Sequence, residues 1–468
     1  MAPRTLAETA LSSLRERLTG EAVAPADPGY DDVRTVFNGM IDRRPALVVL
    51  CESGADVSHA VRFARDHDLE IAVRGGGHSV AGMSATEGGL VVDLRRMHSV
   101  IVNPAHRTAR VGGGATMSHL DRATQPHALA TTGGRASTTG VGGFTLGGGS
   151  GWLERKFGLA CDNLLAAEVV TADGETVHAS ADDHPELFWA LHGGGGNFGV
   201  ATALTLRLHP LPAMSMAMLF LLPENAGEAL RTYRDFAEAA PDEIGGAIIC
   251  LTAPPEPFVP DRLVGRLVCA LLVTCAGPES ELRRLAAPLL ALPREAEIVA
   301  ELPYADLQCM LDDPPGMRNY WSAEYLTAFP DDAVRVYAAL ADTMPVPSGS
   351  QHIMFPMGGA VARGGGDHPV PWRSAPWAVH PFGVWENPAD DGRARGWVRG
   401  VRAAMRPWAL DAVYLNFIGA EGEDRVIAAF GEENYRRLAA VKARYDPDNV
   451  FRLNHNIRPT APAAPAAV

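Results

Sequence analysis

The sequence predicts an α+β protein built from two domains. Its 468 residues exceed what one ordinary core organises, and a hydrophobic content of 47% can fill more than one core. A strand, helix and strand open the chain at residues 46–79. Near residue 210 the pattern changes to longer strand segments that alternate with helices. We therefore expect one domain over residues 1–210 and a second over 211–411.

The first 210 residues alternate short strands with helices. ALVVLCES (46–53) predicts a buried strand, and ADVSHAVRFARDHDL (55–69) predicts a helix because its apolar positions recur three or four apart. EIAVRGGGHS (70–79) predicts a strand that runs into a glycine loop. Residues 164–180 predict a β-hairpin with its turn at Asp173-Gly174. The other expected elements are a helix at 5–19, strands at 89–94, 99–103 and 108–114, a helix at 116–125, and a helix, glycine loop and strand over 185–211.

The chain after residue 210 predicts a second α+β unit and then a separate closing segment. Its expected strands are 214–222, 246–253, 268–277 and 351–362, and its expected helices are 226–240, 278–292 and 331–344. Residues 412–458 form the closing segment, whose helix stops at Asp446-Pro447 because proline disfavours helix at the residue before it. The tail at 459–468 is rich in Pro and Ala and is expected to be disordered.

Charge and cysteine usage exclude several functions. Acidic residues number 55 against 41 basic ones, and the net charge of −14 repels phosphate backbones and anionic lipids. We therefore expect neither nucleic acid nor a membrane as partner, and a cytoplasmic location because no signal peptide or apolar span is evident. The six cysteines lack CxxC spacing and no H-x-x-x-H motif occurs, so neither a disulfide framework nor a metal site is predicted. Nothing in the sequence indicates an oligomeric state.

Glycine is concentrated in one part of the chain. Between Arg74 and Gly199 lie 25 of the 48 glycines. Such clusters mark turns or places where the backbone approaches a ligand closely. A Rossmann loop is not supported, because His78 follows Gly75-Gly76-Gly77, and no P-loop motif occurs. Several glycine loops, rather than one, are therefore expected to surround a phosphate-containing cofactor.

Five blocks of sequence carry a resemblance to a known family. They are IAVRGGGHSVAGMS (71–84), TTGVGGFTLGGGSGWLERKFGLACDNLLAAEVVTADG (138–174), ELFWALHGGGGNFGVAT (186–202), YLNF (414–417) and NYRRLAAVKARYDPDNVFRLNHNI (434–457). In this order they resemble the covalent-flavin oxidases of the berberine bridge enzyme-like family. The resemblance implies an FAD-binding domain split between the N- and C-terminal parts of the chain. It also implies a central substrate domain that roofs the flavin with an antiparallel sheet.

The resemblance also implies which residues hold FAD. His78 matches the histidine bonded to the flavin 8α carbon, and Cys161 matches the cysteine that bonds flavin C6 in bicovalent members. The expected pyrophosphate loop comprises Arg74, Gly75, Gly76, Gly77, Ser79 and Gly82. Thr138, Thr139, Gly140 and Gly142 are expected near the pyrophosphate or ribityl chain, Val200 on the adenine side, and Tyr414, Asn416 and Asn454 at the ring and ribityl.

Two positions bear on the reaction with substrate and oxygen. Thr139 stands where the family places a gate beside the flavin, and a residue of its size is expected to admit oxygen. Phe417 replaces the tyrosine that serves as substrate base in many members, so another base is needed. His380 is the first candidate because imidazole titrates near neutral pH. Tyr320 and Glu324 are alternatives, while Tyr414 is expected to contact the flavin rather than act as base.

Three functions remain open from the sequence. The first is a bicovalent FAD oxidase that takes a hydride from an alcohol, hemiacetal or C–N centre of a bulky natural product and reduces O2 to H2O2. The second is a flavin-dependent oxygenating enzyme acting on a polyketide-like substrate. The third is a flavin-carrying protein that binds a metabolite without oxidising it.

Overall fold

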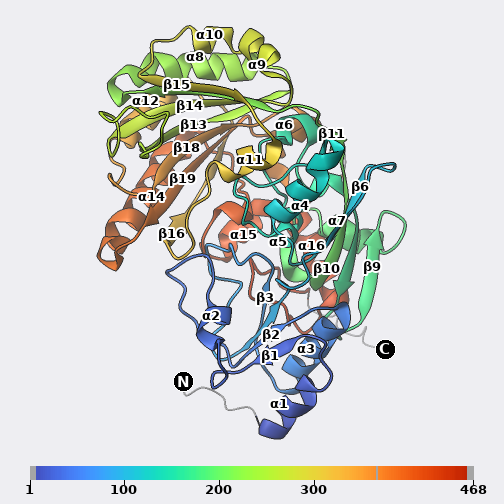
Figure 1. The fold of residues 1–468 in the computed structure, drawn as a ribbon. Helices are drawn as coiled ribbons and strands as arrows, with labels where there is room; N and C mark the ends of the chain where they lie inside the picture. The colour runs from blue at the N-terminus through green and yellow to red at the C-terminus, as the bar shows by residue number, and fades with distance from the viewer. Residues whose placement is uncertain (1–6, 365–366, 461–468) are drawn as a thin grey trace, which may run out of the picture.

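The computed structural model describes residues 7–364 and 367–460 and shows two bodies stacked on one another (Figure 1). One body contains a four-stranded and a five-stranded sheet formed by the first 210 residues. The other contains an eight-stranded sheet whose strands lie between residues 215 and 385. This is the two-domain α+β arrangement that the sequence predicts.

The four-stranded sheet carries the first glycine loop at the end of a strand. Its order is β1 (Glu21–Val23), β2 (Leu47–Leu50), β4 (Leu90–Asp93) and β3 (Ile71–Arg74). β4 runs parallel to β2 and β3, and α3 (Gly54–Asp66) connects β2 to β3. The helix starts at Ser53, which exchanges hydrogen bonds with Asp56 in a capping box. The predicted strand, helix and strand are thus present, and the glycine loop begins directly after Arg74.

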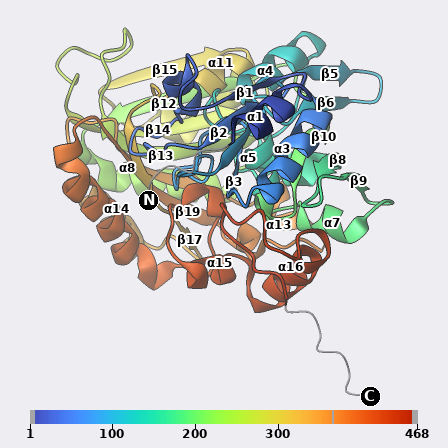
Figure 2. The same ribbon diagram turned by 90° about the horizontal axis from the view of Figure 1, so that it is seen from below.

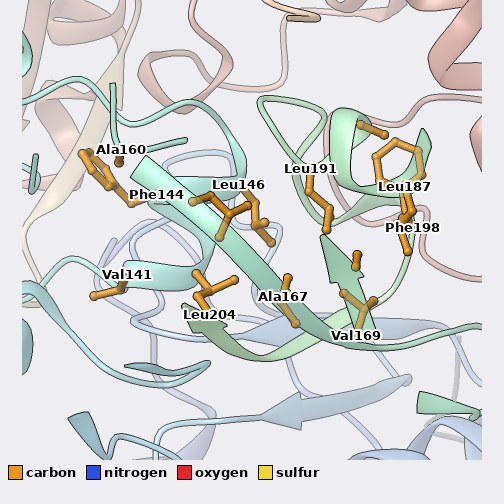
Figure 3. Packing of buried hydrophobic residues seen from close by; sticks show 14 of the residues in the cluster. Val141, Phe144, Leu146, Ala160, Ala167, Val169, Leu187, Leu191, Phe198 and Leu204 are labelled. Atoms are coloured by element: carbon orange, nitrogen blue, oxygen red, sulfur yellow. The ribbon is translucent and has the colours of Figure 1, made fainter. Parts of the chain in front are cut away.

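The five-stranded sheet is antiparallel and packs against a short helix. Its order is β5 (Val100–Asn103), β6 (Thr108–Gly112), β10 (Val200–Arg207), β8 (Leu164–Val170) and β9 (Thr176–Ser180). The helix α5 (Val141–Leu146) places Val141, Phe144 and Leu146 in the same buried cluster as Ala167, Val169 and Leu204 of the sheet (Figure 3). Burial of these side chains fixes the backbone of α5, whose first turn faces the cavity described below.

The eight-stranded sheet carries a layer of helices on the face away from the first body. Its order is β15 (Ala296–Glu301), β12 (Ser215–Leu221), β14 (Leu267–Cys275), β13 (Ile244–Thr252), β18 (Gln351–Pro356), β19 (Trp377–Trp385) and β16 (Arg318–Trp321), with β17 (Glu324–Leu326) also on β19. α8 (Ala226–Ala239), α9 (Glu279–Leu285) and α10 (Ala287–Leu290) lie on the side away from the first body (Figure 1). α12 (Asp331–Ala341) and α14 (Asp391–Met405) join this layer.

Alternation along the strands sends side chains to two different layers. On β13, Ile248 and Cys250 belong to the cluster under the helices, whereas Ile249 belongs to the cluster facing the first body. The second cluster also includes Phe355 of β18 and Tyr414 from the closing segment. Both faces of the sheet are therefore buried. The face opposite the helix layer forms a roof over the first body.

The C-terminal segment returns to the first body. α15 (Glu423–Phe430) and α16 (Glu432–Tyr445) contribute Phe430 and Leu438 to the core around Phe198 (Figure 2). Lys442 is fully buried and donates hydrogen bonds to Asp446 at 2.6 Å and to the carbonyls of Asn197 at 2.6 Å and Phe451 at 2.9 Å. This one ammonium group ties the closing segment to the glycine loop that precedes β10.

The remaining elements connect these layers. They are α1 (Glu8–Arg15), α2 (Tyr30–Arg34), α4 (Met117–Thr124), α6 (Glu154–Phe157), α7 (Pro185–Ala190), α11 (Tyr304–Cys309), α13 (Ala360–Arg363), β7 (Leu129–Ala130) and β11 (His209–Pro210). In the described part of the chain, no helix is both long and apolar enough to cross a membrane.

Three local expectations differ from the structure, and one lies outside it. The strand expected over 351–362 ends at Pro356, and the helix α13 (Ala360–Arg363) follows it. The glycine-rich segment 140–151 carries no helix signal in sequence, yet α5 forms there because its three apolar side chains are buried together. The helix expected over 278–292 is two helices, α9 and α10, with the break at Ala286 before Pro288. The tail expected to be disordered lies outside the described residues from 461 onward.

Candidate active site

A cavity of about 370 Å³ lies between the first body and the roof sheet. Glycine loops, the start of α5 and the closing segment line its floor, and β18 and β19 line its roof. Such a volume falls in the range of small-molecule and cofactor sites. The cavity therefore joins backbone surfaces that suit phosphates to side chains that can meet a substrate.

Two glycine loops meet at the floor of this cavity. A Cβ atom on Gly76 would lie 2.3 Å from the backbone nitrogen of Gly140, and a Cβ atom on Gly140 would lie 2.3 Å from the nitrogen of Gly76. Gly77 has a φ of +74°, a conformation that favours glycine. Only glycine permits this approach, and it leaves the backbone exposed to the cavity along Gly75, Gly76, Gly77 and Ser79.

A third loop and the closing segment complete the floor. Gly193, Gly194, Gly195, Gly196 and Gly199 line the cavity together with Asn454 and His455. Asn454 donates its side-chain amide to the carbonyl of Phe451 at 2.9 Å, while its Oδ1 is buried without a hydrogen-bond partner. A buried acceptor that lacks a partner costs free energy unless a ligand supplies the donor.

His78 projects from the first loop as a neutral imidazole. Its ring stacks on Phe37 with 3.9 Å between centroids, and its Nε2 lies 2.8 Å from Thr138 Oγ1. Burial lowers the pKa of His78 to about 4. The ring is therefore unprotonated at neutral pH, and its Nδ1 is left as the nitrogen that can bond a bound group.

His380 is the polar group of the roof. Its Nδ1 donates to the carbonyl of Ser322 at 2.9 Å, which leaves Nε2 as the acceptor, and its ring stacks on Phe417 at 4.2 Å. Only 2% of the residue is exposed. Burial lowers the pKa of His380 to about 4, against the opposing effect of the Ser322 carbonyl and with a further lowering by Arg135. His380 is thus a cavity-lining group that stays neutral at physiological pH, and not a surface histidine that titrates near neutrality.

The two alternative bases lie elsewhere. Tyr320 faces α14, where the guanidinium carbons of Arg395 and Arg399 lie 5.9 and 5.6 Å from its ring centre. Its neighbour Trp321 lines the cavity instead, because successive side chains on a strand point to opposite faces. Glu324 is buried in ion pairs with Arg402 at 2.8 Å and Arg425 at 3.0 Å. Neither residue can reach a molecule in the cavity.

Tyr414 is held by hydrogen bonds in the cavity wall. Its hydroxyl accepts the backbone N–H of Gly149 at 3.0 Å and the side-chain amide of Asn416 at 2.8 Å. Burial raises the pKa of Tyr414 well above its usual range. The phenol stays protonated and positions the glycine-rich segment beside it, so it does not act as a base.

Arg135 is a charged residue that sequence reasoning missed. Its guanidinium carbon lies 4.0 Å from the ring centre of Phe355, and its Nη2 donates to Glu154 at 2.9 Å. The side chains of Arg135 and Glu154 are only 12% and 3% exposed. No motif marks this pair in sequence. Arg135 nevertheless lines the cavity and is the cation nearest His380 whose charge affects its pKa.

Comparisons with known proteins agree with this site. Residues 45–180 match the model of an FAD-binding domain, and residues 413–458 match that of berberine and berberine-like proteins. The (R)-6-hydroxynicotine oxidase of Paenarthrobacter nicotinovorans is 31% identical over 456 residues, covering 94% of this chain and 97% of that protein. The chain belongs to the berberine bridge enzyme-like family of FAD-linked oxidoreductases.

Solved structures of the family share the whole fold. The crystal structure of 6-hydroxy-D-nicotine oxidase from Arthrobacter nicotinovorans has a TM-score of 0.83 and 29% identity, covering 94% of this chain and 98% of that one. Berberine bridge enzyme from Eschscholzia californica has a TM-score of 0.83 at 20% identity, over 97% and 99% of the two chains, which shows the fold alone. Membership makes this chain an FAD-linked oxidoreductase.

The cavity fits FAD as this family binds it. Glycines whose Cβ atoms would clash leave room for a pyrophosphate, and the unpartnered Oδ1 of Asn454 offers an acceptor to a ribityl hydroxyl or a ring N–H. Of the residues expected to hold FAD, those on the cavity wall are Gly75, Gly76, Gly77, His78, Ser79, Thr139, Gly140, Gly142, Tyr414, Asn416 and Asn454. Thr138 does not line the wall but contacts His78.

Four residues expected at the cofactor lie behind the cavity wall. Arg74 is 1% exposed and donates to the carbonyls of Arg34 at 3.0 Å and Ser84 at 3.3 Å, so its side chain braces the loop from outside. Gly82 has a φ of +73°, and its missing Cβ makes room for Ile41. Val200 is fully buried in the core around the four-stranded sheet, although its neighbours Gly199 and Ala201 line the cavity.

Cys161 is the fourth of these residues, and its thiol is buried behind the cavity wall. It is 0% exposed, belongs to the core beneath the roof sheet and does not line the cavity. Asp162, the next residue, forms an ion pair with Arg373 at 2.7 Å that holds this turn against the second body. Burial raises the pKa of the Cys161 thiol well above its usual range, so the nucleophilic thiolate is disfavoured.

Within residues 7–364 and 367–460, no group of three or more His, Cys, Asp or Glu side chains is arranged to hold a metal ion.

Proposed function

We propose that this chain is an oxidase that carries FAD through one bond, from His78, and oxidises an alcohol, hemiacetal or C–N centre of a bulky substrate. The balance is one hydride and one proton removed from the substrate and O2 reduced to H2O2. Bound FAD supplies the two-electron acceptor and the return of electrons to oxygen. The observation that carries the proposal is an unprotonated His78 on the glycine-lined floor, beneath a roof that presents His380.

Residues of the protein would bind the cofactor, accept the proton, exclude water and admit oxygen. The backbone along Gly75–Ser79 and at Gly140 and Gly142 would hold the cofactor phosphates and ribityl. His380 would accept the proton of the substrate at Nε2, since its Nδ1 donates to Ser322. Phe355, Phe417 and Trp321 form the apolar walls that would exclude water around a flat substrate. Thr139 lies on the cavity wall, and we assign it the role of the residue that admits oxygen.

One relative supports the proposal that the substrate is oxidised at a C–N centre. The relative with 31% identity is named for oxidation of 6-hydroxynicotine, whose ring amine provides a C–N centre. The charged or titratable side chains on the cavity wall include His380, Arg135 and Asp313, beside aromatic rings. A substrate with an aromatic or polycyclic portion suits these walls, and a natural product of that kind is proposed.

The attachment is tested by acid precipitation of the purified protein. The wild type should leave its yellow colour in the pellet, and His78→Ala should release it into the supernatant because the bonding nitrogen is lost. Cys161→Ala, the matched control, should keep the colour in the pellet. Retention of colour by His78→Ala together with loss in the double variant would restore the bicovalent arrangement.

A measurement of oxygen use separates the oxidase from the oxygenating alternative. The replacement of a tyrosine base by Phe417 is what favours that alternative, because oxygen insertion need not use such a base. One H2O2 per product and no labelled oxygen in the product from ¹⁸O2 are expected. Label in the product would identify an oxygenase, and binding of a metabolite without bleaching of the flavin colour would identify a binding protein.

A further inference from the structure

Two cysteines face each other in the roof sheet. Cys250 on β13 and Cys269 on β14 are directly paired in the antiparallel register, and their Sγ atoms lie 2.6 Å apart. This separation is well inside the roughly 3.5–4.0 Å at which non-bonded atoms make optimal contact. In the described part of the chain, no other two cysteine sulfurs are hydrogen-bonding partners.

The strand register at this pair is compatible with a disulfide. Residues directly opposite in an antiparallel ladder have Cα atoms about 4.5–5.5 Å apart, and disulfides span Cα distances of roughly 4.4–6.8 Å. Closing the gap from 2.6 Å to a bond of about 2.05 Å therefore needs only small rotations of the two side chains.

The pair lies on the helix-covered face of the sheet, away from the cavity. Cys250 and Cys269 are 0% and 1% exposed, and both belong to the core under α8 and α12. Their strand neighbours Ile249 and Ala270 face the other side, where a second cavity of about 990 Å³ adjoins the first. The segment between the two strands, including Pro254, Glu256 and Phe258, lines this second cavity.

We propose that Cys250 and Cys269 are a modification site that forms an intrachain disulfide in the presence of hydrogen peroxide. Two thiols and one H2O2 give one S–S bond and two H2O. Each sulfur loses one electron, the two thiol protons go to water, and the O–O bond breaks. The proposed oxidase reaction supplies the peroxide, so the proposal rests on that function for its oxidant, and added peroxide tests the bond independently.

The bond would fix the base of the segment that lines the second cavity. It joins β13 to β14 on the side where the sheet is packed, so the hairpin between them could no longer separate at that end. Burial together with the neighbouring Cys269 raises the pKa of the Cys250 thiol, so oxidation of the folded protein is expected to be slow. The same burial would shield the finished bond from reducing thiols.

Thiol counting and peptide mapping test the proposal. The holoenzyme is made in a Cys309→Ala background, because Cys309 is exposed and would react with peroxide directly. Incubation with H2O2, without substrate, should lower the thiol count in denaturant from five to three, and non-reducing digestion should yield one peptide pair joined through Cys250 and Cys269. The oxidised protein should also have a higher Tm than the reduced one.

Two further variants keep the outcome decisive. Adding Cys250→Ala should leave all four remaining thiols unchanged. Adding Cys275→Ala instead, at a buried cysteine on the same strand as Cys269, should still allow the loss of two thiols. Peptide mapping of the wild-type protein tests the bond without relying on the folding of any variant. An unchanged thiol count after prolonged peroxide treatment, or a disulfide between other cysteines, would overturn the proposal whether or not the chain proves to be an oxidase.

Discussion

His380 combines two properties that are seldom found in one residue: it is buried, and it presents a free acceptor nitrogen to a cavity. The hydrogen bond from Nδ1 to Ser322 fixes the tautomer and the ring plane, while stacking on Phe417 fixes its position. Where many family members place a tyrosine, this chain places an aromatic ring that supports a histidine. Phe417, which has no ionisable group, thus supports the ring of His380, the base that we propose.

We expect the rate of flavin reduction by the substrate to be independent of pH from about 8 down to about 5. It should then fall as the pH approaches 4, because the pKa of His380 is lowered to about 4 and only the neutral ring accepts a proton. His380→Asn should lower the anaerobic reduction rate by roughly 10²–10⁴-fold, the usual range for a general base. Stopped-flow measurement of flavin bleaching against pH provides the check.

His352→Phe serves as the control, because His352 is buried on the same sheet but faces the helix layer. It should leave the reduction rate close to that of the wild type. Near-wild-type reduction in His380→Asn would discard His380 as the base and point to a substrate acidic enough to need none.

At the scale of elements, the site depends on two glycine loops that no single motif describes. A Cβ atom on Gly76, after the end of β3, would lie 2.3 Å from the backbone nitrogen of Gly140 at the start of α5, although the two residues are more than sixty positions apart in the sequence. Sequence shows that glycine gathers in both places, but it does not show that the two loops touch. Their contact follows from burial of the apolar side of α5 against the five-stranded sheet.

Gly76→Ala should reduce the ratio of flavin to protein and lower the stability of the protein. Its Cβ would overlap backbone atoms of Gly140, which cannot rotate away as a side chain can, and overpacking of this kind costs about 1–3 kcal/mol. Visible absorbance relative to protein absorbance, together with the Tm, measures both effects. Gly396→Ala in α14, where a Cβ meets nothing within 4 Å, is the control: it should leave the flavin ratio unchanged and should not lower the Tm, because alanine favours a helix more than glycine does. Full flavin content in Gly76→Ala would show that the loop contact is not needed to hold FAD.

The same scale explains why sequence alone does not place several residues relative to the cavity. Tyr320 and Trp321 are adjacent aromatic residues on β16, and only the pairing of that strand with β19 decides which of them faces the cavity. Cys161 lies next to Asp162, whose ion pair with Arg373 is a contact between residues far apart in sequence. Arg135 was missed for a similar reason, since its partners Glu154 and Phe355 come from different domains.

For the whole molecule, the pattern of strands and helices was predictable, whereas the packing between the two bodies was not. Periodicity identified the strand-helix-strand start, the hairpin over 164–180 and the main strands of the roof, because each is a local signal. The burial of His380 depends on the roof sheet and the closing segment together, which a single strand does not reveal. Family resemblance supplied the position of His78, and the structure supplied its neutral state.

Buried histidines also predict how the stability of the whole molecule depends on pH. Burial lowers the pKa of His192 and His380 to about 4 and that of His352 to about 3, and all three are less than 9% exposed. In the unfolded chain they would titrate near 6.5. Between pH 6.5 and 4 the unfolded state therefore binds more protons than the folded state, and stability falls as the pH is lowered through this window.

The expected loss is up to about 1.4 kcal/mol per pH unit for each of these histidines. Asp121 opposes it, because burial raises the pKa of Asp121 to about 7 and the folded state then gains protons as the pH falls through neutrality. Asp313 and Glu154 oppose it as well, because burial raises the pKa of both carboxyls. His209 and His455 add to the loss, since burial lowers the pKa of each to about 4, so we expect the Tm to decrease from pH 6.5 to pH 4.5. Calorimetry of the holoenzyme across this range gives the slope directly.

His352→Phe should make that slope shallower while preserving the stack on Tyr337, whose ring centre lies 4.0 Å away. The substitution removes a buried Nδ1 that has no hydrogen-bond partner, and it also removes the hydrogen bond of Nε2 with the Tyr337 carbonyl at 3.2 Å, so we expect a net loss of about 1 kcal/mol at pH 7. His106→Gln, at an exposed position, should leave the slope unchanged. A Tm that stays level from pH 6.5 to 4.5 in the wild type would mean that these rings accept protons without unfolding, and that the interior around the roof sheet admits water more readily than its packing indicates.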